Sequence, residues 1–189
     1  MSAALCHAPL VSAEDYLADE IIAEQKHEYL NGVVYAMAGG TLGHSALAIS
    51  VTSLLFQQLR GKRCRVFNSD VLVRVERGAD LRFYYPDASI YCGSIPRHER
   101  VIDDATVIFE VLSPSTARTD TGEKRMAYLG LPSLEAYVLI DSIEREVTVW
   151  RQRDSSWAPE VFTQYSDVIT FANAGCVLSV GDIYDGMEL

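Results

Sequence analysis

The chain has 189 residues, of which 49% are hydrophobic and 22% are charged, and its formal net charge is −10. The acidic balance argues against a general nucleic-acid coat protein, which is normally basic. No apolar run approaches the roughly 20 residues that cross a bilayer, and residues 1–10 lack the basic start and apolar stretch of a secretory signal. We therefore expect one domain over residues 1–189, located in the cytoplasm.

The N-terminal third of the chain predicts a helix, a hairpin and a long helix. Residues 12–15 resemble a capping box, which predicts a short helix from about residue 13. Asn31-Gly32 between apolar runs is the strongest local signal for a β-hairpin, with Glu28 on its first arm. A long helix is expected over about residues 42–60, because apolar residues recur there at helical spacing at Leu47, Val51, Leu54, Leu55 and Leu59.

The rest of the chain predicts strands with one inserted helix. A helix is expected over about residues 120–129, ended by Gly130 and Pro132, and residues 93–104 predict a polar loop. Strands are expected at about residues 64–75, 82–92, 106–112, 136–140, 146–151 and 157–165, with short β segments near 171 and 177–178. This order predicts an α/β (α+β) fold with a central mixed sheet flanked by helices.

The cysteines and the basic clusters give weaker signals. Cys6, Cys64, Cys92 and Cys176 form no CxxC pair, so neither a zinc site nor a disulfide is expected, and we interpret them as small buried hydrophobic residues. Basic residues gather at 60–65, where solvated surface is expected. A second group, formed by Arg118, Lys124 and Arg125, is a candidate local patch for nucleic acid.

Two carboxylates lie in runs that otherwise predict buried strands. Glu110 sits within Val107–Leu112, and Asp87 follows Pro86 in a similar run. A buried carboxylate is unfavourable unless a cation or hydrogen-bond donors compensate it. Proline cannot donate to a strand ladder, so a bulge or edge is expected that turns Asp87 into a cleft. If the two strands pair, the acids face each other, and Mg²⁺ or Mn²⁺ bound by both would relieve their repulsion.

Lys124 and Glu28 are the candidates for completing this site. Lys124 lies on the helix after the Glu110 strand, with Asp120 and Tyr128 one turn either side, and its ammonium could orient or deprotonate a water bound to the ion. Glu28 could supply a further acid from the hairpin. Other interpretations stay open: a turn cap for Asp87, a buried ion pair for Glu110, an exposed Asp120–Lys124 pair and a surface role for Glu28. His44 is more typical of a structural histidine, and nothing local decides whether Asp70 faces the site.

The chain resembles the Uma-type family of putative restriction endonucleases, within the PD-(D/E)XK nuclease superfamily. The resemblance spans nearly the whole chain and rests on residues 29–40, His44, 68–70, 85–87, 110–116, Asp120, Lys124, Tyr128 and 137–141. It implies a restriction-endonuclease-like sheet, with Asp87 and Glu110 as metal ligands and the Val111 carbonyl as a third. The superfamily lysine two positions after the second acid is Leu112 here, and lysine migration within the superfamily favours Lys124 in that role.

These residues predict a magnesium- or manganese-dependent endonuclease that hydrolyses phosphodiester bonds in DNA. Asp87 and Glu110 would hold the ion, Lys124 would position the water or the phosphate, and Glu28 would tune the site. A homodimer is expected, because cutting a duplex calls for two sites related by symmetry. Two alternatives remain: a catalytically silent binding module on a nuclease scaffold, favoured by Leu112, and a metal-dependent hydrolase of small phosphorylated substrates.

Overall fold

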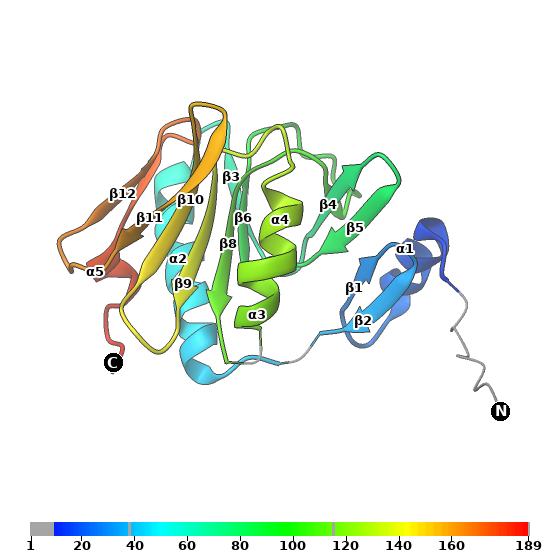
Figure 1. Ribbon diagram of the computed structural model, residues 1–189, viewed down its shortest axis with the longest axis horizontal. Helices are drawn as coiled ribbons and strands as arrows, with labels where there is room; N and C mark the ends of the chain where they lie inside the picture. Colours follow the sequence, from blue (N-terminus) through cyan, green and yellow to red (C-terminus); the bar gives the residue numbers. More distant parts are fainter. Residues whose placement is uncertain (1–9, 38, 115, 189) are drawn as a thin grey trace.

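A six-stranded mixed sheet forms the centre of the computed structural model, in the order β11-β10-β9-β8-β6-β3 (Figure 1). β8 and β9 run parallel, and the other neighbouring strands are antiparallel. β8 is buried along almost its whole length because helices cover both faces of the sheet. The six strands are β3 (Arg65–Asn68), β6 (Ala88–Tyr91), β8 (Ala105–Leu112), β9 (Ala136–Asp141), β10 (Val147–Arg153) and β11 (Ser156–Phe162).

The structure describes residues 10–37, 39–114 and 116–188. Cys6 and two residues of the motifs above, Ala38 and Ser115, lie outside these ranges. Within the described ranges, none of the helices combines the length and the apolar composition that spanning a bilayer requires. The single domain and the cytoplasmic location stay predictions.

α2 (Leu42–Leu59) covers one face of the central sheet. It buries Leu47, Val51, Leu55 and Leu59 against the odd-numbered side chains of β8, which confirms the predicted amphipathic helix. The same core contains the hairpin of β12 (Val168–Phe171) and β13 (Cys176–Ser179) and the short α5 (Val180–Ile183). Thr41 caps the start of α2 by accepting the His44 N–H at 3.2 Å.

Three short helical segments cover the opposite face: α3 (Ala117–Thr119), η1 (Asp120–Lys124) and α4 (Arg125–Tyr128). Figure 1 shows α3 and α4 on the other side of the sheet from α2. Tyr128 packs there with Ile108 and Tyr137 in a second core. The predicted helix is present, but η1 is a π-helical turn, a feature that occurs frequently at functional sites.

A second sheet, in the order β2-β1-β5-β4-β7, extends the molecule towards the N-terminus (Figure 1). Asn31 and Gly32 take φ values of 50° and 93° at the turn between β1 and β2, which confirms the predicted hairpin. The short α1 (Ala13–Ile22) packs beside it through Tyr16 and Tyr29. The strands are β1 (His27–Leu30), β2 (Val33–Ala36), β4 (Leu72–Arg77), β5 (Asp80–Tyr84) and β7 (Val101–Ile102).

Two of the predicted strands each divide between the two sheets. The expected strand at 82–92 ends with β5 at Tyr84 and resumes as β6 at Ala88, with Pro86 in the break. The expected strand at 64–75 divides into β3 and β4, and the predicted loop at 93–104 contains the short β7. Apolar residues continue on both sides of each break, so the apolar pattern does not show where the chain crosses between sheets.

Cys64 and Cys92 form a disulfide, so the interpretation of these two cysteines as buried thiols is wrong. β3 pairs with β6 so that Arg65 faces Tyr91, which places the two cysteines opposite each other just beyond the paired strands. This proximity depends on the strand register, which the spacing along the sequence does not reveal. Cys176 is buried and carries a free thiol, as expected.

Reducing the Cys64–Cys92 disulfide is expected to lower the free energy of unfolding by about 3 kcal/mol. The bond closes a loop with a sequence separation of 28 residues, and its loss increases the entropy of the unfolded chain. Urea unfolding with and without dithiothreitol measures the difference. A Cys64→Ala/Cys92→Ala variant is the control, because reductant should leave its unfolding midpoint unchanged. An equal midpoint for the oxidised and reduced native protein would contradict the prediction.

Candidate active site

An open cavity of about 570 Å³ lies between the segment that precedes β6, the end of β8, η1 and the start of α2. Asp87, Glu110 and Lys124 line it, so the structure brings three of the predicted site residues together. His44 and Asp120 line it as well. The cavity therefore collects groups that lie far apart in the sequence.

Asp87 reaches the cavity from the break between the two sheets. Ala88 of β6 faces Phe109 of β8 in antiparallel register, so Asp87 comes next to Glu110, as the hairpin hypothesis required. The Val111 N–H donates to Asp87 Oδ2 at 2.7 Å, which fixes this carboxylate against β8. Asp87 therefore anchors the central strand as well as facing the cavity.

Glu110 is only 3% exposed at the middle of the sheet. It points to the face that carries η1 and α4, where Lys124 Nζ lies 3.3 Å and the Tyr128 hydroxyl 3.4 Å from its Oε1. Burial raises the pKa of Glu110 well above its ordinary value; Lys124 opposes this, and Asp120, Asp87 and Glu28 add to it. The site therefore holds more negative charge than its lysine balances.

Lys124 is surrounded by carboxylates and is 7% exposed. Its Nζ lies 2.8 Å from Glu28 Oε1, 3.3 Å from Glu110 Oε1 and 3.6 Å from Asp120 Oδ1. Burial alone would lower the pKa of the lysine, but these three neighbours together raise it above the ordinary value. Asp120 is 2% exposed, so the interpretation as an exposed helical pair is wrong.

Glu28 reaches the site from β1 of the second sheet. Besides Lys124, it accepts the Tyr85 N–H at 3.3 Å. Burial raises the pKa of Glu28, and the contacts with Lys124 lower it in part. The side chain is 14% exposed, so Glu28 is not an ordinary surface residue of the hairpin.

His44 is the site residue that sequence reasoning interpreted as structural. Its Nε2 lies 3.2 Å from Asp87 Oδ2. The hydrogen bond with Asp87 raises the pKa of His44, against the opposite effect of burial. The sequence places this histidine after Gly39-Gly40 at a helix start, but only the packing of α2 on β8 brings it to Asp87.

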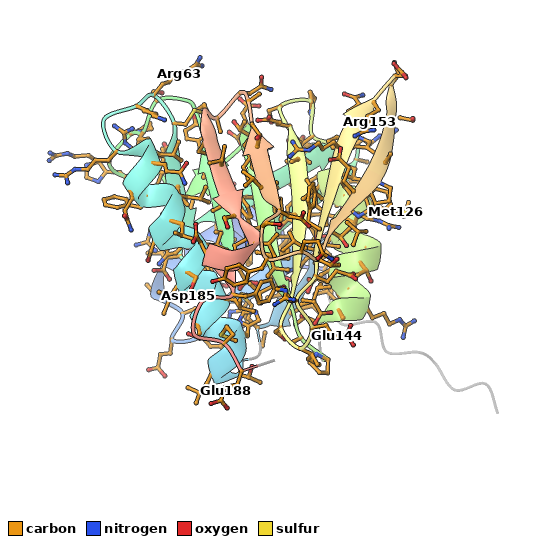
Figure 2. The ribbon with its side chains drawn as sticks, turned by 90° about the vertical axis from the view of Figure 1, so that its left-hand side faces the viewer. Arg63, Met126, Glu144, Arg153, Asp185 and Glu188 are labelled. Carbon is orange, nitrogen blue, oxygen red and sulfur yellow. A yellow bond between two sulfur atoms is a disulfide. The ribbon has the colours of Figure 1, made fainter. Side chains whose placement is uncertain are left out.

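Other candidates lie elsewhere. Asp70 has a side chain that is 67% exposed and pairs with Lys26 Nζ at 2.5 Å. The predicted cationic group of Arg118, Lys124 and Arg125 does not form, because Lys124 is buried among acids and the Arg125 guanidinium stacks on Trp150. The basic residues at 60–65 follow the C-terminal end of α2, whereas His44 lies in its first turn. The 18-residue helix is about 27 Å long, and Figure 2 labels Arg63 at the end opposite to His44.

The donor set fits a hard divalent cation. The carboxylates of Glu28, Glu110 and Asp120 lie within 3.6 Å of the Lys124 ammonium, and Asp87 lines the same cavity. Oxygen ligands are those that Mg²⁺ prefers. Within the residues that the structure describes, no group of three or more His, Cys, Asp or Glu side chains is arranged to hold an ion by itself. A site of two carboxylates completed by water is typical of Mg²⁺, which dehydrates reluctantly.

Comparisons with known proteins agree with this fold. The family model described as "Uma2: Putative restriction endonuclease" matches residues 13–179. The uncharacterized protein slr1290 of Synechocystis sp. is 32% identical over 95% of this chain and 94% of its own length. A second protein of that organism, sll1609, is 27% identical over 70% of this chain and 75% of its own. The crystal structure of a putative nuclease belonging to DUF820 from Anabaena variabilis superposes with a TM-score of 0.73 at 23% identity, covering 92% of this chain and 97% of that one. This likeness confirms the predicted fold class.

Proposed function

Because the chain belongs to the Uma2 family of putative restriction endonucleases, we propose that it is a magnesium- or manganese-dependent endonuclease that hydrolyses phosphodiester bonds in DNA. Asp87 and Glu110 would hold the ion, with the Val111 carbonyl as a further oxygen ligand. When bound, the ion would lower the pKa of a water molecule and stabilise negative charge on the phosphate. The fold alone does not carry this proposal, since one fold serves many activities.

The observation that carries the proposal is the contact of Lys124 Nζ with Glu110 Oε1 at 3.3 Å. Leu112 occupies the position of the superfamily lysine, which favoured a silent module. The ammonium of Lys124, on η1, nevertheless lies beside Glu110 inside the cavity. Its neighbouring carboxylates raise the pKa of Lys124 above the ordinary value of a lysine. In this proposal Lys124 positions the attacking water or the scissile phosphate.

Glu28 and Asp120 support this arrangement from two different elements. Both contact Lys124 Nζ, Glu28 from β1 and Asp120 from the start of η1. A lysine side chain has many rotamers, and three carboxylate partners restrict them. Glu28 thus acts through the position and charge of Lys124, which couples the N-terminal hairpin to the reaction.

We also propose that the protein acts as a homodimer, because cleavage of both strands of a DNA duplex calls for two sites related by symmetry. Light scattering after gel filtration measures the oligomeric state directly. A mass near the 21.0 kDa of one chain, at the concentration at which duplex DNA is cut, would argue for single-strand cleavage by a monomer.

The test is a cleavage assay on plasmid DNA, linear duplex and single-stranded DNA, with Mg²⁺ or Mn²⁺. We expect divalent-dependent cleavage that EDTA abolishes and that re-added metal restores. A small phosphodiester such as bis-p-nitrophenyl phosphate distinguishes the alternative hydrolase, which would cleave it and leave DNA intact. Calorimetric titration with Mn²⁺ distinguishes the silent module, which would bind no ion up to millimolar concentration.

A further inference from the structure

The outward face of α2 is apolar although it is exposed. Leu42, Ile49 and Phe56 are 92%, 63% and 59% exposed, and because they recur every seven residues they form one stripe along the helix. The opposite face of α2 packs on the central sheet. The helix contains no Asp, Glu, Lys or Arg, in a chain whose net charge is −10. A helix that is apolar all round is normally covered all round, so this stripe indicates a binding partner.

The stripe is complementary to a second copy of itself. In an antiparallel pair of helices with a two-fold axis at Ile49, Leu42 of each copy lies opposite the partner's Phe56, because both residues are equally far from the axis along the sequence. Ser45 comes opposite the partner's Ser53 in the same way. Both serines are small and exposed, so the two helix axes can approach to the usual distance of about 8–10 Å.

The two ends of α2 carry charges of opposite sign. The basic residues at 60–65 follow its C-terminal end. The C-terminal segment of the chain lies beside its start, where a Cβ on Gly43 would be 3.5 Å from the Met187 side chain. This segment exposes Asp185 and Glu188, and Figure 2 shows the basic and acidic groups at opposite ends of α2. An antiparallel pair therefore brings the basic end of each copy to the acidic end of the other, whereas a parallel pair would place like charges together.

We propose that the homodimer forms by antiparallel packing of α2 on α2 of a second copy of this chain, with Ile49 at the two-fold axis. The inference rests on the proposed function, which calls for a dimer, and it adds the surface that forms it. Ser45 and Ala48 also line the cavity, so the interface borders each active site. The two His44 residues would lie about 15 Å apart along the helices, which is less than one turn of a DNA duplex, about 34 Å.

The first test measures the dimer dissociation constant of full-length variants by sedimentation equilibrium. Ile49→Glu places two carboxylates opposite each other at the axis, so we expect the constant to rise at least about 100-fold. Ile21→Glu is the matched control, because Ile21 is 57% exposed on α1, away from α2 (Figure 1). It should leave the constant unchanged. Both positions are exposed, so the circular dichroism of both variants should match that of the wild type.

The second test uses introduced thiols to determine the orientation of the helices, in a Cys6→Ser background. Axes about 9 Å apart leave the Cα atoms of opposed residues about 5 Å apart, a distance that a disulfide spans. Ile49→Cys should therefore cross-link to itself on mild oxidation. Leu42→Cys alone should not, but a mixture of Leu42→Cys and Phe56→Cys proteins should give a cross-linked heterodimer. Cross-linking of Leu42→Cys to itself, without the heterodimer, would overturn the antiparallel arrangement.

The outcomes separate this inference from the proposed function. If the wild type is a dimer, but Ile49→Glu dimerises equally well and the thiols do not cross-link, another surface forms the dimer and only this inference fails. If the wild type is a monomer at the concentration at which it cuts duplex DNA, both the homodimer and this surface are wrong, and a different protein becomes the occupant of the stripe. Nicking of plasmid DNA by Ile49→Glu without linearisation would support both proposals, because the variant leaves the groups of the active site unchanged.

Discussion

Divalent-dependent DNA cleavage is expected to fall on the order of 10³-fold when Asp87 is replaced by asparagine or Glu110 by glutamine. Each change keeps the size of the side chain and removes one negative oxygen ligand. A neutral amide binds Mg²⁺ more weakly than a carboxylate, so less ion would be bound and its charge would be less well placed. Single-turnover cleavage of a labelled duplex at saturating Mn²⁺ measures the loss.

The two substitutions differ in their expected effects on stability. Asp87 Oδ2 accepts the Val111 N–H at 2.7 Å, so Asp87→Asn puts an anchoring bond of β8 at risk. Glu110 is 3% exposed, and burial raises its pKa, so Glu110→Gln removes an unfavourable buried charge from the metal-free protein. We expect Glu110→Gln to be at least as stable as the wild type although it is inactive.

Asp70→Asn is the matched control for both variants. Asp70 is an acid of the same type as Asp87, but its side chain is 67% exposed and pairs with Lys26 outside the cluster around Lys124. It should retain wild-type cleavage within a factor of a few. Cleavage by Glu110→Gln at the wild-type rate, with circular dichroism unchanged, would contradict the assignment of Glu110 to the ion.

The sequence predicted the acids of the site because burial and charge conflict there. A carboxylate within Val107–Leu112 is costly in a packed sheet, and Glu110 indeed lies at 3% exposure among Lys124 and Tyr128. The hairpin at Asn31-Gly32 and the stripe on α2 were predicted for similar reasons, since turn chemistry and helical periodicity are local properties.

What the sequence did not predict depends on contacts between distant elements. His44 meets Asp87 because α2 packs on β8, and Cys64 meets Cys92 because of the register between β3 and β6. The division of residues 82–92 between two sheets is also non-local, since Tyr84 and Ala88 are both buried. Burial patterns record that a residue is inside, and they do not record which element lies against it.

Replacing Lys124 by methionine is expected to lower the free energy of unfolding by about 3–5 kcal/mol, the usual effect of removing one partner from a buried ion pair. Glu110, Glu28 and Asp120 would lose the ammonium that lies within 3.6 Å of all three. Cleavage should also fall about 10²- to 10³-fold, because the group that positions the water or phosphate is missing. Urea unfolding and the single-turnover assay measure the two effects, with Lys62→Met as the control, since Lys62 bonds to the Gly175 carbonyl far from the cavity.

The double variant Lys124→Met/Glu110→Gln separates the structural role of Lys124 from its chemical role. Removing the second charge leaves fewer uncompensated carboxylates, so the double variant should be about 1–3 kcal/mol more stable than Lys124→Met alone, the coupling expected for residues in contact. Its cleavage should stay as low as that of either single variant, because neither the ion ligand nor the ammonium is restored. Recovery of stability without recovery of cleavage would mean that the acids around Lys124 are kept for chemistry at a cost in stability. A Lys124→Met protein as stable as the wild type would mean that these carboxylates are protonated in the folded state, and that the lysine does not hold them in their charged form.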